Sequence, residues 1–143
     1  MAGLSLAAHY FKRVTIMSDK TIAQKLLIKE GYKVLFVNPP RGYKTLLGPL
    51  PRNAAVLKAP AEAADVIQLF VANRKELEAQ LPKLKSALAP KGALWVTYYK
   101  GTSKTKTDIN RDTIVEYART LGLEGVAMIS VDDDWSALRL KVV

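Results

Sequence analysis

The 143-residue sequence contains no cysteine and only one histidine, His9. Without cysteine the chain can form no disulfide, thiolate metal site or cysteine nucleophile. With a single histidine near the N-terminus, neither histidine-based catalysis nor a site of several histidines is expected. Ser103 and Asp108 have no histidine near them in the sequence, so a hydrolytic triad is not predicted.

Long apolar runs are also missing. No stretch approaches the roughly 20 consecutive apolar residues that cross a bilayer. At the N-terminus, Lys12 and Arg13 follow the apolar run instead of preceding it, and no small-residue cleavage site is evident, so no signal peptide is predicted. We therefore expect a soluble, cytoplasmic protein with no membrane partner.

Acidic residues are scarce, with 13 Asp and Glu against 22 Lys and Arg and a formal net charge of +9. This excess favours polyanions electrostatically. The basic residues are nevertheless spread from Lys12 to Lys141, and the densest run, Lys100 to Lys106, contains only three lysines. A solvated basic surface is the preferred interpretation, and electrostatic nucleic-acid binding is the alternative.

Consecutive carboxylates occur at one place, Asp132-Asp133-Asp134. Neighbouring carboxylates in a turn cannot all converge on one ion, so this segment predicts a solvated turn and no metal site.

The length of the chain suits one domain that buries about two thirds of its unfolded surface. We divide the chain into an N-terminal extension, residues 1–19, and a single domain, residues 20–143.

The most informative segment runs from Asp65 to Lys100. Residues 65–71 and 93–99 are almost continuously apolar, as in parallel strands buried on both faces. Between them, leucines at helical spacing predict a helix over 74–88, in which Pro82 forces a kink or a late start, followed by a turn at 89–92. A strand-helix-strand unit of this kind predicts an α/β fold.

Similar patterns predict the other elements: helices at 20–29, 43–47 and 108–121, and strands at 33–38, 53–58, 125–131 and 135–143. The short acidic connection between the last two strands predicts an antiparallel hairpin. Residues 59–64 are too few for the helical crossover of about a dozen residues that joins parallel neighbours. Either the strands on either side of this segment are not a βαβ pair, or the chain returns in extended form beneath the sheet, so this edge of the sheet is expected to be abbreviated.

This order of elements resembles a trimmed class I methyltransferase, and Leu88-Ala89-Pro90-Lys91-Gly92-Ala93-Leu94 looks like that family's Leu-x-Pro-Gly-Gly-x-Leu turn. Residues 31–51, 65–99 and 131–136 are closer still to a family of small uncharacterised bacterial proteins, which is described by fold and not by reaction. The resemblance implies a Rossmann-like three-layer α/β fold with a mostly parallel sheet and a C-terminal antiparallel hairpin.

The segment that follows the first strand lacks the features of a usual S-adenosylmethionine site. Such a site needs glycines there, so that the backbone can approach the cofactor, and usually an acid at the end of the second strand. Residues 38–43 contain a single glycine, and the second predicted strand ends in Leu57-Lys58. The stiff backbone beside Asn38 is expected to leave too little room, so S-adenosylmethionine is possible but not favoured.

Asn38-Pro39-Pro40 also resembles the Asp/Asn-Pro-Pro-aromatic motif of amino-methyltransferases, which holds an extruded base. Here Arg41 replaces the aromatic residue, and the motif follows the first strand instead of the fourth. We interpret it as a rigid turn at the strand exit.

Ligands of open parallel sheets bind beyond the carboxyl ends of the strands. Arg41, Arg74 and Lys100 are expected to face one crevice there, which predicts a small anionic or nucleotide-like ligand. The alternative is that these loops carry polar and basic residues for solubility. The ligand-binding residues predicted at this edge are Asn38, Arg41, Gly42, Tyr43, Asn73, Arg74, Lys100 and Ser103.

No catalytic residue can be named from the sequence. The predicted function is therefore a non-catalytic binding or interaction module, and whether the protein is an enzyme stays open. The alternative is an S-adenosylmethionine-dependent methyltransferase with an atypical site, in which Arg41, Asn73 and Lys100 contact cofactor or substrate.

Overall fold

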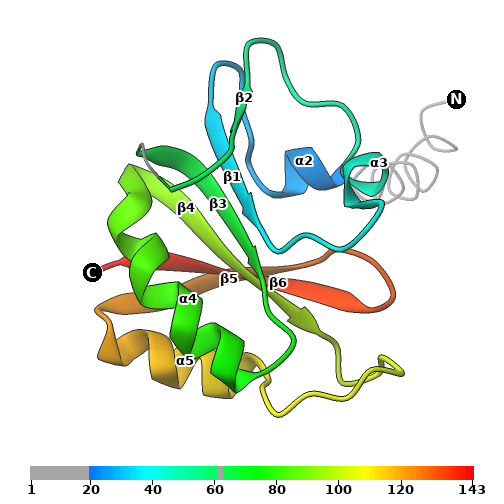
Figure 1. Cartoon of the computed structure of the whole chain (residues 1–143), viewed down its shortest axis with the longest axis vertical. Helices are drawn as coiled ribbons and strands as arrows, with labels where there is room; N and C mark the ends of the chain where they lie inside the picture. Colours follow the sequence, from blue (N-terminus) through cyan, green and yellow to red (C-terminus); the bar gives the residue numbers. More distant parts are fainter. Residues whose placement is uncertain (1–19, 61–62) are drawn as a thin grey trace, which may run out of the picture.

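The computed structural model describes residues 20–60 and 63–143, which form one six-stranded sheet with helices on both faces (Figure 1). The strand order is β2-β1-β3-β4-β6-β5. The first four strands in this order are parallel, and β6 and β5 are antiparallel additions. The strands are β1 Lys33–Val37, β2 Ala55–Leu57, β3 Ala64–Phe70, β4 Leu88–Tyr99, β5 Leu123–Ser130 and β6 Trp135–Val142. This arrangement confirms the predicted fold class, including the C-terminal hairpin.

The two faces of the sheet carry separate cores because successive side chains of a strand point in opposite directions. On one face, Ile67 and Leu69 pack with the leucines of α4 (Arg74–Ala87) and with Ile114 of α5 (Arg111–Thr120). On the other, Val66 and Phe70 pack with α2 (Ile22–Lys25) and α3 (Tyr43–Leu47). Figure 1 shows α4 and α5 together on one side of the sheet and α2 and α3 on the other. None of the described helices is long and apolar enough to span a bilayer.

The position of β2 answers the question raised by the short segment 59–64. Val34 of β1 is aligned with Val56 of β2 on one side and with Val66 of β3 on the other. Strands β2 and β3 therefore flank β1 and are not neighbouring strands of a βαβ unit. With only three residues, β2 is a short edge strand.

Helix α2 is shorter than the predicted 20–29. Thr21 caps it by accepting from the backbone N–H of Gln24, and the Gln24 side chain accepts from the backbone N–H of Thr21 in return. The helix ends at Lys25 because Leu27 adopts a left-handed conformation with φ +67°. The predicted end of this helix at Lys29 is therefore too late. Ser18 and Asp19, residue types that favour helix caps, lie outside the described residues.

The predicted turn at 89–92 is a bulge within β4. Ala64 of β3 is aligned with Leu88 and Val66 with Ala93, so residues 89–92 loop out between two paired stretches of the same strand. Lys91 takes the left-handed conformation, with φ +67°. A Cβ at Gly92 would lie 2.9 Å from the carbonyl oxygen of Ala89 and 3.1 Å from that of Ala64, so only glycine fits there without a shift of the backbone.

Gly92→Ala is expected to lower the free energy of unfolding by about 1–3 kcal/mol, the usual cost of overpacking a tight site. The matched control is Gly101→Ala, since a Cβ at Gly101 meets no atom within 4 Å and its φ is not positive. The control should lie within about 0.5 kcal/mol of the wild type. Urea unfolding monitored by tryptophan fluorescence measures both, and equal effects would contradict the close contact at Gly92.

Candidate functional site

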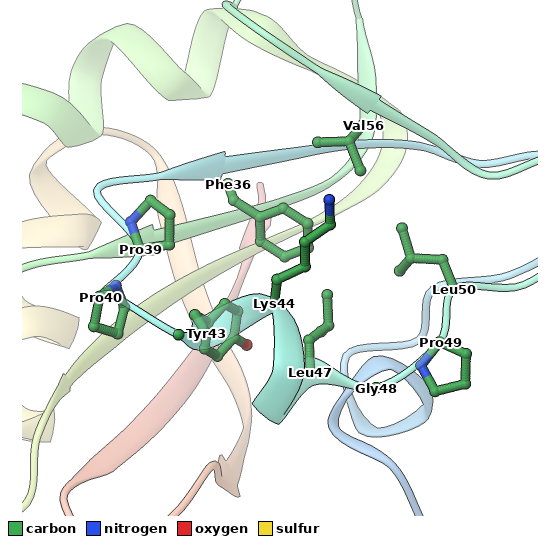
Figure 2. A pocket seen from close by; sticks show the side chains of 11 residues that line it. Phe36, Pro39, Pro40, Tyr43, Lys44, Leu47, Gly48, Pro49, Leu50 and Val56 are labelled. Carbon is green, nitrogen blue, oxygen red and sulfur yellow. The ribbon is translucent and has the colours of Figure 1, made fainter.

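A large pocket lies where β1 leaves the sheet, between β1, β2 and α3, and is here named the β1 pocket (Figure 2). Its volume is about 630 Å³. In Figure 2, Phe36 of β1 lies at its centre, Lys44 and Leu47 face it from α3, and Val56 approaches from β2. The pocket is lined by Phe36, Pro39, Pro40, Gly42, Tyr43, Lys44, Leu47, Gly48, Pro49, Leu50 and Val56. Apart from Lys44, no lining side chain is charged.

The loop from Asn38 to Gly42 shapes this pocket. Asn38 and Gly42 are both left-handed, with φ +58° and +81°, and the two prolines between them are restricted in φ. The chain thereby reverses and starts α3 directly over the sheet. A Cβ at Gly42 would meet no atom within 4 Å, so the backbone is open there. The expectation that S-adenosylmethionine has too little room beside Asn38 stays a prediction, which the titration described below tests.

A buried polar network joins α3 to the centre of the sheet. The Tyr43 hydroxyl donates to Gln68 Oε1 at 2.6 Å, and Gln68 Nε2 donates to Thr97 Oγ1 at 3.0 Å. Gln68 and Thr97 are fully buried. Burial raises the pKa of the Tyr43 phenol well above its ordinary value, so the hydroxyl stays protonated and remains a donor. The network fixes the wall of the β1 pocket that Tyr43 forms.

Sequence reasoning missed Gln68 and Thr97, although a signal was available. Each is a polar residue inside an otherwise apolar buried strand, and such a residue needs a partner. Nothing in the sequence, however, identifies Tyr43 as that partner, because the contact depends on how α3 packs.

A row of four aromatic rings runs from the β1 pocket along the carboxyl ends of the parallel strands. The ring centroids of Tyr43 and Phe70 are 4.7 Å apart, and those of Phe70 and Trp135 are 5.4 Å apart, both edge to face. Trp135 then stacks on Tyr99 at 4.0 Å. Edge-to-face and stacked contacts are favourable ring geometries. We call Tyr43, Phe70, Trp135 and Tyr99 the aromatic arc.

A second, smaller pocket lies at the other end of the aromatic arc, where β4 leaves the sheet, and is named the β4 pocket. Its volume is about 270 Å³. It is lined by Tyr98, Tyr99, Lys100, Gly101, Thr105, Lys106, Thr107, Ile109 and Asn110. Two lysines and several polar residues therefore line it.

The loop that forms the β4 pocket is fastened at several points. The buried Ser103 hydroxyl donates to Asp134 Oδ1 at 3.0 Å and accepts from the backbone N–H of Thr105 at 3.1 Å. The Thr107 hydroxyl donates to the carbonyl of Ala72 at 2.7 Å. These bonds hold the loop between β4 and α5 against the ends of β3 and β6, so the pocket is preformed.

The predicted ligand-binding residues are distributed over both pockets. Gly42 and Tyr43 line the β1 pocket, and Lys100 lines the β4 pocket, whose loop Ser103 fastens from behind. Arg41 is exposed and, like Asn38, lines neither of these two pockets. The single crevice predicted for Arg41, Arg74 and Lys100 is thus replaced by two pockets, of which only Lys100 lines one.

Asn73 and Arg74 begin α4. The Asn73 side chain caps the helix by accepting from the backbone N–H of Glu76 at 2.9 Å. The Arg74 guanidinium pairs with Glu78 at 2.8 Å and lies 5.9 Å from the ring of Tyr117 on α5. In this structure, Asn73 and Arg74 serve the helix and its packing.

Within residues 20–60 and 63–143, no cluster of three or more Asp, Glu, His or Cys side chains is arranged to hold a metal ion. The acidic turn is organised differently: Asp132 Oδ1 accepts from the backbone N–H groups of Asp134 and Trp135, both at 2.8 Å. Its carboxylate thus closes the hairpin between β5 and β6.

No protein-family model and no curated protein matches the sequence. Solved structures do match its fold. A complex of DhpI with S-adenosylhomocysteine superposes with a TM-score of 0.60 at 13% identity, over 96% of this chain and 90% of that one. A TehB-like S-adenosylmethionine-dependent methyltransferase from Corynebacterium glutamicum gives 0.55 at 16% identity, over 99% of both chains. Aeropyrum pernix fibrillarin with natively bound S-adenosyl-L-methionine gives 0.55 at 14% identity, over 80% and 68%.

These neighbours show that the chain has the Rossmann-like fold of class I S-adenosylmethionine-dependent methyltransferases. They also overturn the predicted function. Several of them are methyltransferases, and some hold S-adenosylmethionine or S-adenosylhomocysteine, which contradicts a non-catalytic module and favours the alternative.

Proposed function

We propose that the protein is an S-adenosylmethionine-dependent methyltransferase with an atypical cofactor site in the β1 pocket. The observation that carries this proposal is the position of that pocket. It opens at the exit loop of β1, at the carboxyl edge of a sheet whose structural neighbours include methyltransferases with bound cofactor. Ligands of open α/β sheets bind at that edge.

The lining residues fit most of the cofactor. Phe36, Pro39 and Pro40 offer flat apolar surface for an adenine ring, and the open backbone at Gly42 lets a ligand approach. The Lys44 ammonium suits the carboxylate of the methionine moiety. No carboxylate lines the pocket to accept from the ribose hydroxyls, and this makes the site atypical.

The bound cofactor would supply a methyl group on a positively charged sulfur, which is electrophilic without further activation. Neither pocket is lined by an Asp, Glu or His side chain that would act as a general base. The protein's contribution would then be to bind both reactants, orient them and exclude water, since correct positioning can supply much of the acceleration of a two-substrate reaction. Such a site suits methyl acceptors that are already nucleophilic and do not need to give a proton to the protein.

Calorimetric titration with S-adenosylmethionine and S-adenosylhomocysteine tests the cofactor site. We expect micromolar binding by the wild type and at least a tenfold loss in Val56→Trp, since the indole would fill the pocket. Val126→Trp is the matched control, because Val56 and Val126 are exposed valines, at 51% and 47%, on edge strands at opposite ends of the sheet. The control should bind like the wild type.

Absence of binding by the wild type at millimolar cofactor would overturn the proposal. Equal losses in the two tryptophan variants would place the cofactor outside the β1 pocket. Formation of S-adenosylhomocysteine in the presence of small-molecule acceptors, measured by mass spectrometry, tests the reaction itself.

Several sequence predictions stay as predictions beside this proposal. They are the cytoplasmic location, membership in the family of small bacterial proteins, and ligand contacts by Asn38, Arg41, Asn73 and Arg74. Electrostatic nucleic-acid binding would show as affinity that falls steeply with salt.

A further inference from the structure

We infer that the β4 pocket binds the phosphate group of a small methyl acceptor. This inference rests on the proposed function, and it names the class of acceptor. Four features of the described residues support it: an excess of basic residues, a fixed ammonium group, neutral donors on the same wall, and a place on the same edge of the sheet as the β1 pocket.

Basic residues outnumber acidic ones at the pocket. Lys100 and Lys106 line it, Lys104 lies in the same loop, and no acidic residue lines it. The acids beside the loop are Asp134, which accepts from Ser103 behind it, and Asp108, which follows it. In the part of the chain that the structure describes, no salt bridge of Lys100, Lys104 or Lys106 is found. Lysines at a small cavity without a lining carboxylate favour an anion as its ligand.

Lys100 is held in place before any ligand arrives. Its backbone N–H donates to the carbonyl of Asp134 at 2.8 Å, and its Nζ donates to Ser130 Oγ at 2.7 Å. An ammonium group has three donors, so two remain for a ligand. A preformed position lowers the entropy cost of binding.

Neutral donors complete the wall. The Asn110 side-chain oxygen accepts from the backbone N–H of Thr113 at 3.0 Å, which leaves its amide NH₂ for a ligand. The Thr105 hydroxyl also borders the cavity. Lysines and neutral donors around a cavity suit a phosphate. A phosphate monoester has three strong acceptor oxygens and a charge of about −1.5 to −2, so it can use more of these donors than a carboxylate can.

The size and position of the pocket favour a small acceptor. A volume of about 270 Å³ lies just below the usual range for small-molecule sites, about 300–1,000 Å³. The aromatic arc runs from Tyr43, which lines the β1 pocket, to Tyr99, which lines the β4 pocket. An acceptor anchored by its phosphate would therefore lie on the same edge of the sheet as the cofactor.

An NMR titration of the ¹⁵N-labelled protein with phenyl phosphate, a small phosphate monoester, tests the inference. We expect saturable shifts confined to amides of residues 98–110, and at least tenfold weaker binding of acetate. Lys106→Gln should weaken the binding of phenyl phosphate about threefold. The double variant, Lys100→Gln with Lys106→Gln, should weaken it at least tenfold. Lys141→Gln, which removes an exposed lysine from β6, is the matched control and should leave the affinity unchanged.

Shifts spread over the whole basic surface, or equal losses in the control, would overturn the inference. A single-stranded oligonucleotide that binds these residues a hundredfold more tightly, with steep salt dependence, would replace the small acceptor with a nucleic acid. Cofactor binding is measured separately by calorimetry. The double lysine variant should keep it within twofold, so loss of the phosphate site and failure of the proposed function are distinguishable.

Discussion

Gln68→Leu is expected to lower the free energy of unfolding by about 3 kcal/mol. Leucine fills nearly the same space, so the cost comes from hydrogen bonds. The substitution leaves the Tyr43 hydroxyl and Thr97 Oγ1 without the partners they have now, at 2.6 and 3.0 Å. Each buried polar group that loses its partner costs about 1–3 kcal/mol. Urea unfolding monitored by circular dichroism measures the change.

A double-mutant cycle separates this mechanism from a general packing defect. Tyr43→Phe removes the hydroxyl group that Gln68→Leu would leave without a hydrogen-bond partner. In the Tyr43→Phe background, Gln68→Leu should therefore cost about 1–2 kcal/mol less than in the wild type. Strictly additive losses would show that the two side chains do not depend on each other and would contradict the network.

The parallel part of the sheet could be predicted because its strands are buried on both faces. Residues 65–71 and 93–99 show this as nearly continuous apolar runs, and β3 and β4 occupy them. The terminal hairpin was equally visible, since only 132–134 separates its strands. For these elements, burial on both faces and turn length are visible in the local sequence, so the sequence predicts them.

The ends of elements were less predictable because they depend on single backbone conformations. The pattern of α2 continues to Lys29, but Leu27 adopts a left-handed φ, which leucine rarely does. The bulge at 89–92 has the same origin, since Lys91 is left-handed although Gly92 follows it. Residue type does not reveal such conformations when tertiary packing imposes them.

The sequence predicted the position of the candidate pockets better than the residues that line them, for a physical reason. The rule that ligands bind at the carboxyl edge identified both exit loops, and Gly42, Tyr43 and Lys100 do line pockets there. It could not tell which side chains turn inward. Arg74 turns to Glu78 and Tyr117, a choice set by the packing of α4 against α5.

The expectation about the cofactor rests on the same kind of local feature. A glycine-poor loop suggests a crowded backbone, but a Cβ at Gly42 would meet no atom within 4 Å, and the loop borders a pocket of about 630 Å³. The number of glycines in a loop indicates local freedom of the backbone. It does not measure the space that the rest of the fold leaves beside it.

Trp95→Ala is expected to lower the free energy of unfolding by about 3–5 kcal/mol, the usual cost of deleting a buried tryptophan. Trp95 is 1% exposed and lies in the central strand β4. Its Nε1 donates to the carbonyl of Leu26 at 3.1 Å, so the indole also holds the end of α2. Native stabilities are about 5–15 kcal/mol, so this single change would remove a large part of the total.

Two further substitutions separate packing from hydrogen bonding. Trp95→Phe keeps an aromatic ring but removes the donor to Leu26, and should cost about 1–3 kcal/mol, a smaller loss than that of Trp95→Ala. Trp135→Phe, at a half-buried tryptophan of the aromatic arc, is the control and should leave the Leu26 contact intact.

Hydrogen exchange gives a local test of the same contact. A four-residue helix is not stable alone, so α2 depends on its docking to the sheet through Ile22, Ala23 and Leu26. In Trp95→Phe, the amides of Leu26 and Ile28, which donate to Ile22 and Ala23, should exchange faster while those of β3 stay protected. Uniformly faster exchange would mean that Trp95 stabilises the whole sheet and has no particular effect on α2.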